Sequence, residues 1–169
     1  IVGYTNAGKS TLLNRMTRSD VEAEDKLFAT LDPTSRRLRF PREREIVLTD
    51  TVGFIRNLPN ELIEAFRSTF EETLEAALIL HVADCGDPEL DTHLAEVEQT
   101  LTNLGAHEIP RILVFNKSDT VDSAVLEELK MLHSAHFCSA VTGDGLQKLL
   151  GMIEQQLFRS KNILRGESN

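Results

Sequence analysis

Short apolar runs recur along the chain, and each one ends in a polar or glycine-containing segment. The runs lie at residues 46–48, 78–82 and 112–115, and within them apolar side chains follow one another without strict alternation. Runs of this length and kind are typical of strands buried on both faces. We therefore predict buried strands over these ranges.

Helical patterns separate the runs. One helix has Asp87 as its N-cap candidate, Pro88 in its first turn and Gly105 after its end. Its apolar face consists of Leu90, Leu94, Val97, Leu101 and Leu104. A helix from Pro59 carries Leu62, Ile63, Phe66, Phe70 and Leu74, and a last one carries Leu146, Leu149, Leu150, Ile153 and Leu157. Strands that alternate with amphipathic helices predict an α/β fold with a mostly parallel sheet and helices on both faces.

Residues 35–50 break this alternation. Two strand-like stretches follow each other through Pro41, Arg42 and Glu43, which leaves no room for a helix. We predict an antiparallel pair there, at the edge of the sheet. The polar tail 159–169 is expected to fray.

Composition limits the class of protein. The chain has 169 residues, 41% hydrophobic and 27% charged, which fits one globular domain and, we expect, a monomer. No apolar run approaches the roughly 18 residues of a membrane span. Two cysteines, in no CxxC spacing, suit a reducing compartment, so we expect a cytoplasmic protein.

The net charge of −9 argues against general nucleic-acid binding by this domain. The one basic cluster comprises Arg36, Arg37, Arg39, Arg42 and Arg44. Its simplest interpretation is a solvated edge strand, and the alternative is a local phosphate-binding surface.

A glycine-rich loop supplies the strongest chemical signal. Residues 3–10, GYTNAGKS, fit G-x-x-x-x-G-K-[ST], follow the short strand of Ile1 and Val2, and open a helix. Such a loop turns backbone N–H groups and a helix N-terminus toward phosphate oxygens. Lys9 is expected to reach the β and γ phosphates, and the Ser10 hydroxyl to bind Mg²⁺. The predicted nucleotide contacts in this segment are Gly3, Tyr4, Thr5, Asn6, Ala7, Gly8, Lys9, Ser10 and Thr11.

Two further motifs select the nucleotide and the metal. Asn116, Lys117, Ser118 and Asp119 follow the strand that ends at Phe115. The Asp119 carboxylate matches the two adjacent donors of guanine, whereas adenine would leave it desolvated and unpaired. Asp50, Thr51, Val52 and Gly53 fit D-x-x-G, with Asp50 near Mg²⁺ and the Gly53 N–H at the γ-phosphate. All three motifs end strands, where open α/β sheets bind ligands, and predict a Ras-like P-loop GTPase with GTP or GDP and Mg²⁺.

Three segments, 3–10, 27–34 and 50–59, together resemble the GTPase domain of the HflX family of ribosome-associated GTPases. The resemblance runs from the first residue to about Leu157. It implies a first switch made of Phe28, Ala29, Thr30, Leu31 and Asp32, with Thr30 as a Mg²⁺ ligand and Thr34 as the competing choice. It also implies that Cys138, Ser139 and Ala140 lie near guanine, with the Ala140 or Ser139 N–H at guanine O6, although Val141 replaces the usual lysine.

The resemblance also places this chain in a larger protein. Because a buried strand normally has about five or six residues, we expect residues 1–158 to be a GTPase domain cut within its first strand. Family members carry an N-terminal domain, associate with the large ribosomal subunit and separate ribosomes under stress. The alternatives are a GTPase of tRNA modification or ribosome assembly, and a switch module that hydrolyses GTP weakly.

Two residues bear on the rate of hydrolysis. Phe54 stands where Ras-like enzymes have a water-orienting glutamine, so intrinsic turnover should be slow. The catalytic group is then Lys9, Thr30, Gly53 and Asn6, whose amide oxygen is a candidate ligand for K⁺. The alternative is that Asn6 only forms hydrogen bonds within the loop.

Overall fold

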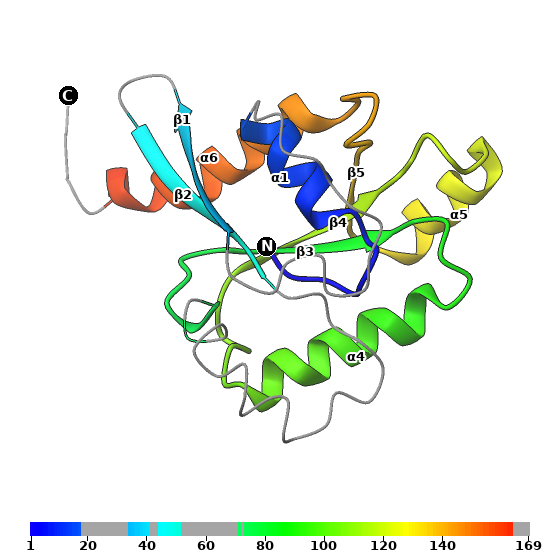
Figure 1. Cartoon of the computed structure of the whole chain (residues 1–169), viewed down its shortest axis with the longest axis horizontal. Coiled ribbons are helices and arrows are strands. Elements are labelled where there is room, and N and C mark those ends of the chain that lie inside the picture. The colour runs from blue at the N-terminus through cyan, green and yellow to red at the C-terminus, as the bar shows by residue number, and fades with distance from the viewer. Residues whose placement is uncertain (18–33, 41–43, 52–70, 72, 164–169) are drawn as a thin grey trace.

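The computed structural model of the chain describes residues 1–17, 34–40, 44–51, 71 and 73–163. Figure 1 shows the order of the elements along the chain. They are α1 (Lys9–Thr17), β1 (Thr34–Phe40), β2 (Arg44–Asp50), β3 (Ile79–Asp84), α4 (Leu90–Asn103), β4 (Arg111–Asn116), α5 (Ser123–Leu132), β5 (His136–Phe137) and α6 (Leu146–Ile163).

The strands form one parallel group and one antiparallel pair. β3, β4 and β5 are parallel neighbours in that order, and β1 pairs antiparallel with β2, as predicted. Val2 forms a parallel bridge with His81. On its other side, the Ile1 nitrogen donates to the Thr49 carbonyl (2.6 Å) and the Thr51 N–H donates to the Ile1 carbonyl (3.3 Å). Residues 1–2 therefore join the two groups of strands.

Helices cover both faces of the sheet, which confirms the α/β class (Figure 1). On one face, α1 and α6 pack against Leu80, Val82 and Val114 through Leu12, Leu13 and Leu149, among others. On the other face, Val97 and Leu101 of α4 pack on Val2 and Ile79. Alternate residues of β3 thus serve two cores, because successive side chains of a strand point to opposite faces.

Helix α4 ends as predicted and begins later than predicted. Gly105 has φ +83°, its N–H donates to Thr102, and the Ala106 N–H donates to Leu101, which together form a Schellman cap. The N-terminal prediction was wrong by two residues. The helix begins at Leu90, and the Asp87 side chain instead accepts the Glu89 N–H (2.9 Å) in the turn before it.

One strand is less buried than predicted. Val47 of β2 is 61% exposed, because no described helix covers that face of β2. The helix predicted from Pro59 lies outside the described residues up to residue 70, and Leu74 is 44% exposed. Within the described part of the chain, no helix has the length and apolar character to span a membrane.

Candidate functional site

The predicted phosphate loop connects Val2 to α1 and is built around close backbone approaches. The Ala7 N–H donates to the Tyr4 carbonyl (3.3 Å), which closes a tight turn. A Cβ on Gly3 would lie 2.1 Å from the Val82 carbonyl oxygen, and one on Gly8 would lie 2.4 Å from the Asn116 amide nitrogen. Both glycines are therefore required by the packing of the loop between β3 and β4.

Lys9 lies at the start of α1 and is 7% exposed. Its Nζ donates to the Tyr4 carbonyl (3.1 Å). Burial lowers the pKa of Lys9 to about 8, while the nearby Asp50 carboxylate acts in the opposite direction. The loop thus holds its lysine inside the fold, beside the turn predicted to receive phosphate.

Ser10 and Asp50, both predicted magnesium ligands, meet at the end of β2. The Ser10 hydroxyl donates to Asp50 Oδ2 (2.5 Å), and Asp50 is 1% exposed. A hydroxyl and a carboxylate converging next to a phosphate loop fit the hard oxygen ligands that Mg²⁺ requires. In the β1–β2 ladder Thr34 stands opposite Asp50, whereas Thr30 lies outside the described residues.

Asn116 joins two parts of the site through its buried side chain. Its Nδ2 donates to the Ala7 carbonyl in the loop (3.0 Å), and its Oδ1 accepts the Ala140 N–H (3.0 Å). The residue is 2% exposed. One amide therefore uses both of its ends to hold the phosphate loop and the segment after β5 in a fixed relation.

Lys117 and Asp119 complete the predicted guanine motif. The Lys117 ammonium pairs with Asp84 Oδ2 (2.8 Å) at the end of β3, and its backbone has φ +62°. Asp119 is exposed and makes no hydrogen bond or ion pair within the described residues. Its carboxylate is thus available to a ligand.

The segment of Cys138, Ser139 and Ala140 follows β5, as predicted. The Cys138 backbone bonds to Phe115 and to the Ser118 N–H, which places the segment beside the guanine motif. The Ser139 side chain accepts the Thr142 N–H (3.0 Å). Burial raises the pKa of the Cys138 thiol to about 12, so this cysteine stays protonated.

One predicted site residue takes part in a different contact, and several others lie outside the described residues. Thr51 is 3% exposed and its hydroxyl donates to the Ile1 carbonyl (2.8 Å), so that group serves the strand junction. Residues 28–32, Val52 and Gly53 lie outside the described residues. Sequence reasoning missed the role of Asp84 as the partner of Lys117, although an acid at the end of a central strand was its signal.

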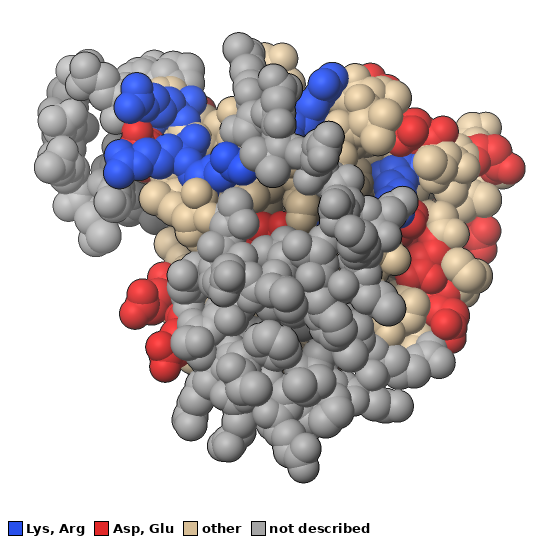
Figure 2. Space-filling view, viewed as in Figure 1, with Lys and Arg blue, Asp and Glu red and all other residues tan. Residues whose placement is uncertain are grey.

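Basic side chains gather over the β1–β2 hairpin, and acidic ones lie over other parts of the same view (Figure 2). Arg37 and Arg39 both pair with Glu45, at 3.1 and 2.9 Å. Arg44 pairs with Glu154 (3.2 Å). Two carboxylates thus pair with three of the four described arginines of the cluster, and the exposure of the Arg37 and Arg39 side chains (73% and 82%) fits the solvated edge strand.

Comparison with known proteins identifies relatives that match most of the chain. A family described as "50S ribosome-binding GTPase" matches residues 1–117. The protein named GTPase HflX of Lacrimispora saccharolytica is 52% identical over 165 residues, which cover 97% of this chain and 39% of that protein. GTPase HflX of Escherichia coli K12 is 44% identical and is matched over 38% of its length by 93% of this chain. The predicted resemblance is confirmed, and the chain spans about two-fifths of the length of these relatives.

Solved structures agree with the fold and the type of site. A GTP-binding protein from Sulfolobus solfataricus in complex with GDP has a TM-score of 0.70 and 29% identity, over 94% of this chain and 51% of that one. Era in complex with MgGDPNP and a segment of 16S ribosomal RNA has a TM-score of 0.74 and 26% identity, over 92% and 55% of the two chains.

Proposed function

Since the chain belongs to the family of 50S ribosome-binding GTPases, we propose that it hydrolyses GTP to GDP and phosphate as the switch domain of a longer protein. The observation that carries the proposal is the double attachment of Asn116. It fixes the phosphate loop relative to Asp119 and Ala140, so that one nucleotide can contact all three. A phosphate loop without this attachment would leave the choice of base open.

Phosphate binding and transition-state stabilisation fall to Lys9 and the loop. When a nucleotide binds, the Lys9 ammonium leaves the Tyr4 carbonyl and pairs with phosphate oxygens. The negative charge of these oxygens favours the protonated form of the lysine. Ser10 and Asp50 hold magnesium, with Thr30 as a further ligand and Gly53 at the γ-phosphate. Bound magnesium neutralises charge on the phosphate oxygens.

Guanine is selected by Asp119, which accepts from N1–H and N2–H of the base. The pair with Asp84 holds Lys117 so that its alkyl stem lies along the base. The Ala140 N–H now donates to Asn116, and we propose that guanine O6 approaches the same short segment of Ser139 and Ala140.

Slow intrinsic turnover follows from Phe54, which can neither donate nor accept a hydrogen bond to the attacking water. We expect a rate at or below roughly 10⁻² s⁻¹. The large ribosomal subunit is the proposed activator and partner of the parent protein. The family description and the relatives named GTPase HflX support this partner. Ribosome splitting under stress and a cytoplasmic location belong to the same proposal.

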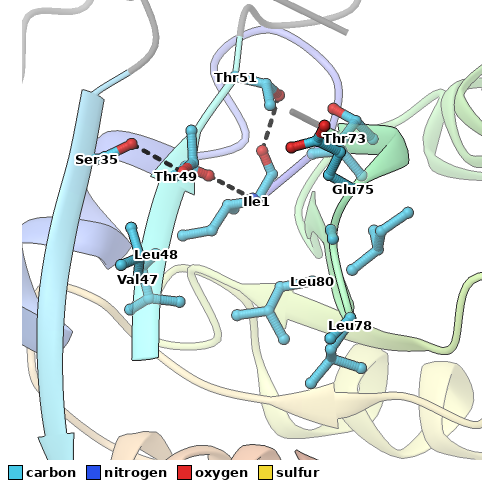
Figure 3. A pocket seen from close by; sticks show the side chains of 14 residues that line it. Ile1, Ser35, Val47, Leu48, Thr49, Thr51, Thr73, Glu75, Leu78 and Leu80 are labelled. Carbon is cyan, nitrogen blue, oxygen red and sulfur yellow. Dashed lines mark hydrogen bonds between the residues drawn. The ribbon is translucent and has the colours of Figure 1, made fainter. Parts of the chain in front are cut away.

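We further propose that the strand of Ile1 and Val2 continues upstream in the parent protein. A cavity of about 490 Å³ lies between β2 and β3 next to Ile1 (Figure 3). Its lining includes Val47, Leu48 and Leu78, and the buried Thr73 hydroxyl has no partner within the described residues. A preceding strand segment would fill this space and pair with both neighbours.

A monovalent cation is proposed as a cofactor through Asn6. This residue is exposed and has φ +60°, in the loop that receives the β and γ phosphates. Its amide oxygen would bind K⁺ and place positive charge where other GTPases use an arginine. Hydrolysis should then be faster in potassium than in sodium at equal ionic strength, and Asn6→Ala should abolish the difference. Equal rates in both salts would contradict this proposal.

Single-turnover hydrolysis of GTP, with and without large ribosomal subunits, tests the main proposal. We expect slow hydrolysis by the chain alone, loss in Lys9→Ala, and stimulation of the parent protein by the subunit. Competition binding with ATP is the control for the base. Equal affinity of the chain for ATP and GTP would contradict the assignment.

A further inference from the structure

Tyr4 and His93 bring the phosphate loop into contact with α4. Their rings stack with centroids 3.6 Å apart and planes at 11°. Tyr4 is the second residue of the loop, and His93 lies in the first turn of the helix that follows β3. The contact therefore joins two elements that are separated in the sequence by β1, β2 and β3.

The Asp87 carboxylate fixes the orientation of the His93 ring through a hydrogen bond. The ring Nδ1 lies 2.5 Å from Asp87 Oδ2, and because a carboxylate only accepts, the imidazole donates. The other oxygen of Asp87 accepts the Glu89 N–H (2.9 Å), so the carboxylate is itself fixed by the backbone. His93 is 13% exposed at its side chain and has little freedom to turn.

The backbone carbonyl of Tyr4 connects the stacked ring to the rest of the phosphate loop. Its carbonyl accepts both the Ala7 N–H and the Lys9 ammonium. Tyr4 and His93 also line a cavity of about 330 Å³, together with residues 5–7 and Asp87. Next to this cavity, the Tyr4 ring is held by its stack on His93.

We propose that His93 is a positioning residue for the phosphate loop. Held by Asp87, it fixes the Tyr4 ring, and through it the carbonyl that places Lys9. This inference rests on the proposed role of the loop in nucleotide binding. It assigns a function to α4 in phosphate affinity that the nucleotide-contacting motifs do not include.

The chain offers a direct optical readout, because Tyr4 is its only tyrosine and it has no tryptophan. Intrinsic emission therefore reports on the stacked ring alone. Removing the hydrogen-bonded imidazole in His93→Ala should change this emission, and His93→Phe should change it while keeping an aromatic ring against Tyr4. Identical emission of wild type and both variants would overturn the proposal.

Nucleotide affinity tests whether loss of the His93 contacts weakens binding at the phosphate loop. In His93→Ala we expect GDP and GTP to bind about tenfold more weakly, and in His93→Phe about threefold, since stacking is kept but the bond to Asp87 is lost. Glu98→Gln is the matched control. It lies on the same helix and contacts His81 and Arg111 rather than the loop.

Glu98→Gln should lower the melting temperature and leave both affinities within about twofold. If it weakens nucleotide binding as much as His93→Ala does at a similar loss of melting temperature, the role of His93 is only structural and the proposal fails. Wild-type affinity in His93→Ala would overturn it as well. If the wild-type chain binds neither GDP nor GTP, the proposed function itself fails instead. Should His93→Ala not fold, the affinity and emission of His93→Phe decide the question.

Discussion

The two sides of the phosphate loop are held in different ways. On the β4 side, the buried Asn116 side chain ties the loop to the segment after β5, and the Cys138 backbone bonds to Phe115 and Ser118. On the β2 side, residues 1 and 2 provide the junction, next to a cavity of about 490 Å³ (Figure 3). The β4 side is therefore held by buried side-chain hydrogen bonds, whereas the β2 side borders an open cavity.

This difference explains why specificity and stability should respond to different substitutions. The polar side chains proposed to bind the nucleotide include Asn116, which also holds the fold. On the β2 side, backbone hydrogen bonds join Ile1 to Thr49 and Thr51, so we expect side-chain substitutions there to cost less unfolding free energy. Substitutions on the two sides separate these contributions.

Asp119→Asn should have the largest effect, and only on ligand binding. We expect GTP affinity to fall about a thousandfold, with preference moving toward xanthosine nucleotides, because the amide donates to the carbonyl that xanthine carries at C2. Since Asp119 is exposed and makes no hydrogen bond or ion pair with a described residue, unfolding free energy should change by less than about 0.5 kcal/mol. Titration with GTP and XTP, together with denaturant unfolding, measures both. A large loss of stability would contradict the separation.

Asn116→Ala should damage affinity and stability together. It leaves the Ala7 carbonyl and the Ala140 N–H without their partner, both inside the fold. The expected cost is about 3 kcal/mol of unfolding free energy.

Thr51→Val is the matched control for Asn116→Ala on the β2 side. It removes a hydroxyl from the Ile1 carbonyl, which keeps the Thr51 N–H as a donor, so the cost should be about 1 kcal/mol or less. Denaturant unfolding of the two variants compares the two sides directly. Equal losses would show that both sides are held alike.

Extending the chain before Ile1 by about four residues of the parent protein should stabilise the β2 side. New ladder bonds and apolar contacts in the cavity should add about 2 kcal/mol, or about 5 °C in melting temperature. An extension of equal length with a proline in its middle is the control, because proline cannot donate to a ladder. If both extensions leave the melting temperature unchanged, the strand does not continue into this cavity.

Local spacing predicted the positions of the motif residues on the β4 side better than it predicted burial on the β2 side. The places of Gly3, Lys9 and Asn116 in the fold follow from local spacing and from strand ends, so the motifs located them, and their roles in nucleotide binding stay predictions. Gly105 was equally predictable, because a helix end that needs φ +83° favours glycine.

Burial and long-range contacts were less predictable. Val47 belongs to an apolar run, yet its exposure of 61% depends on what covers β2, which no local pattern reveals. The stack of Tyr4 on His93 likewise requires the loop and α4 to be brought together by the sheet. The prediction that Asp87 is the N-cap of α4 was wrong, because Pro88 and Glu89 form a turn before the helix begins.

Lys9 lies between the two sides and gives the smallest predicted effect. Its pKa of about 8 in the folded chain is below the ordinary 10.5, so between these values the unfolded state binds more protons. Folding stability contributed by this group therefore rises with pH across that window and is lowest below pH 8. Without nucleotide or magnesium, wild type should gain about 1 kcal/mol over Lys9→Met between pH 8 and 9. The difference between the variants cancels the titration of Cys85 and Cys138, which both share. Denaturant unfolding at several pH values measures the gain, and a difference that stays constant with pH would mean that burial of the ammonium costs nothing.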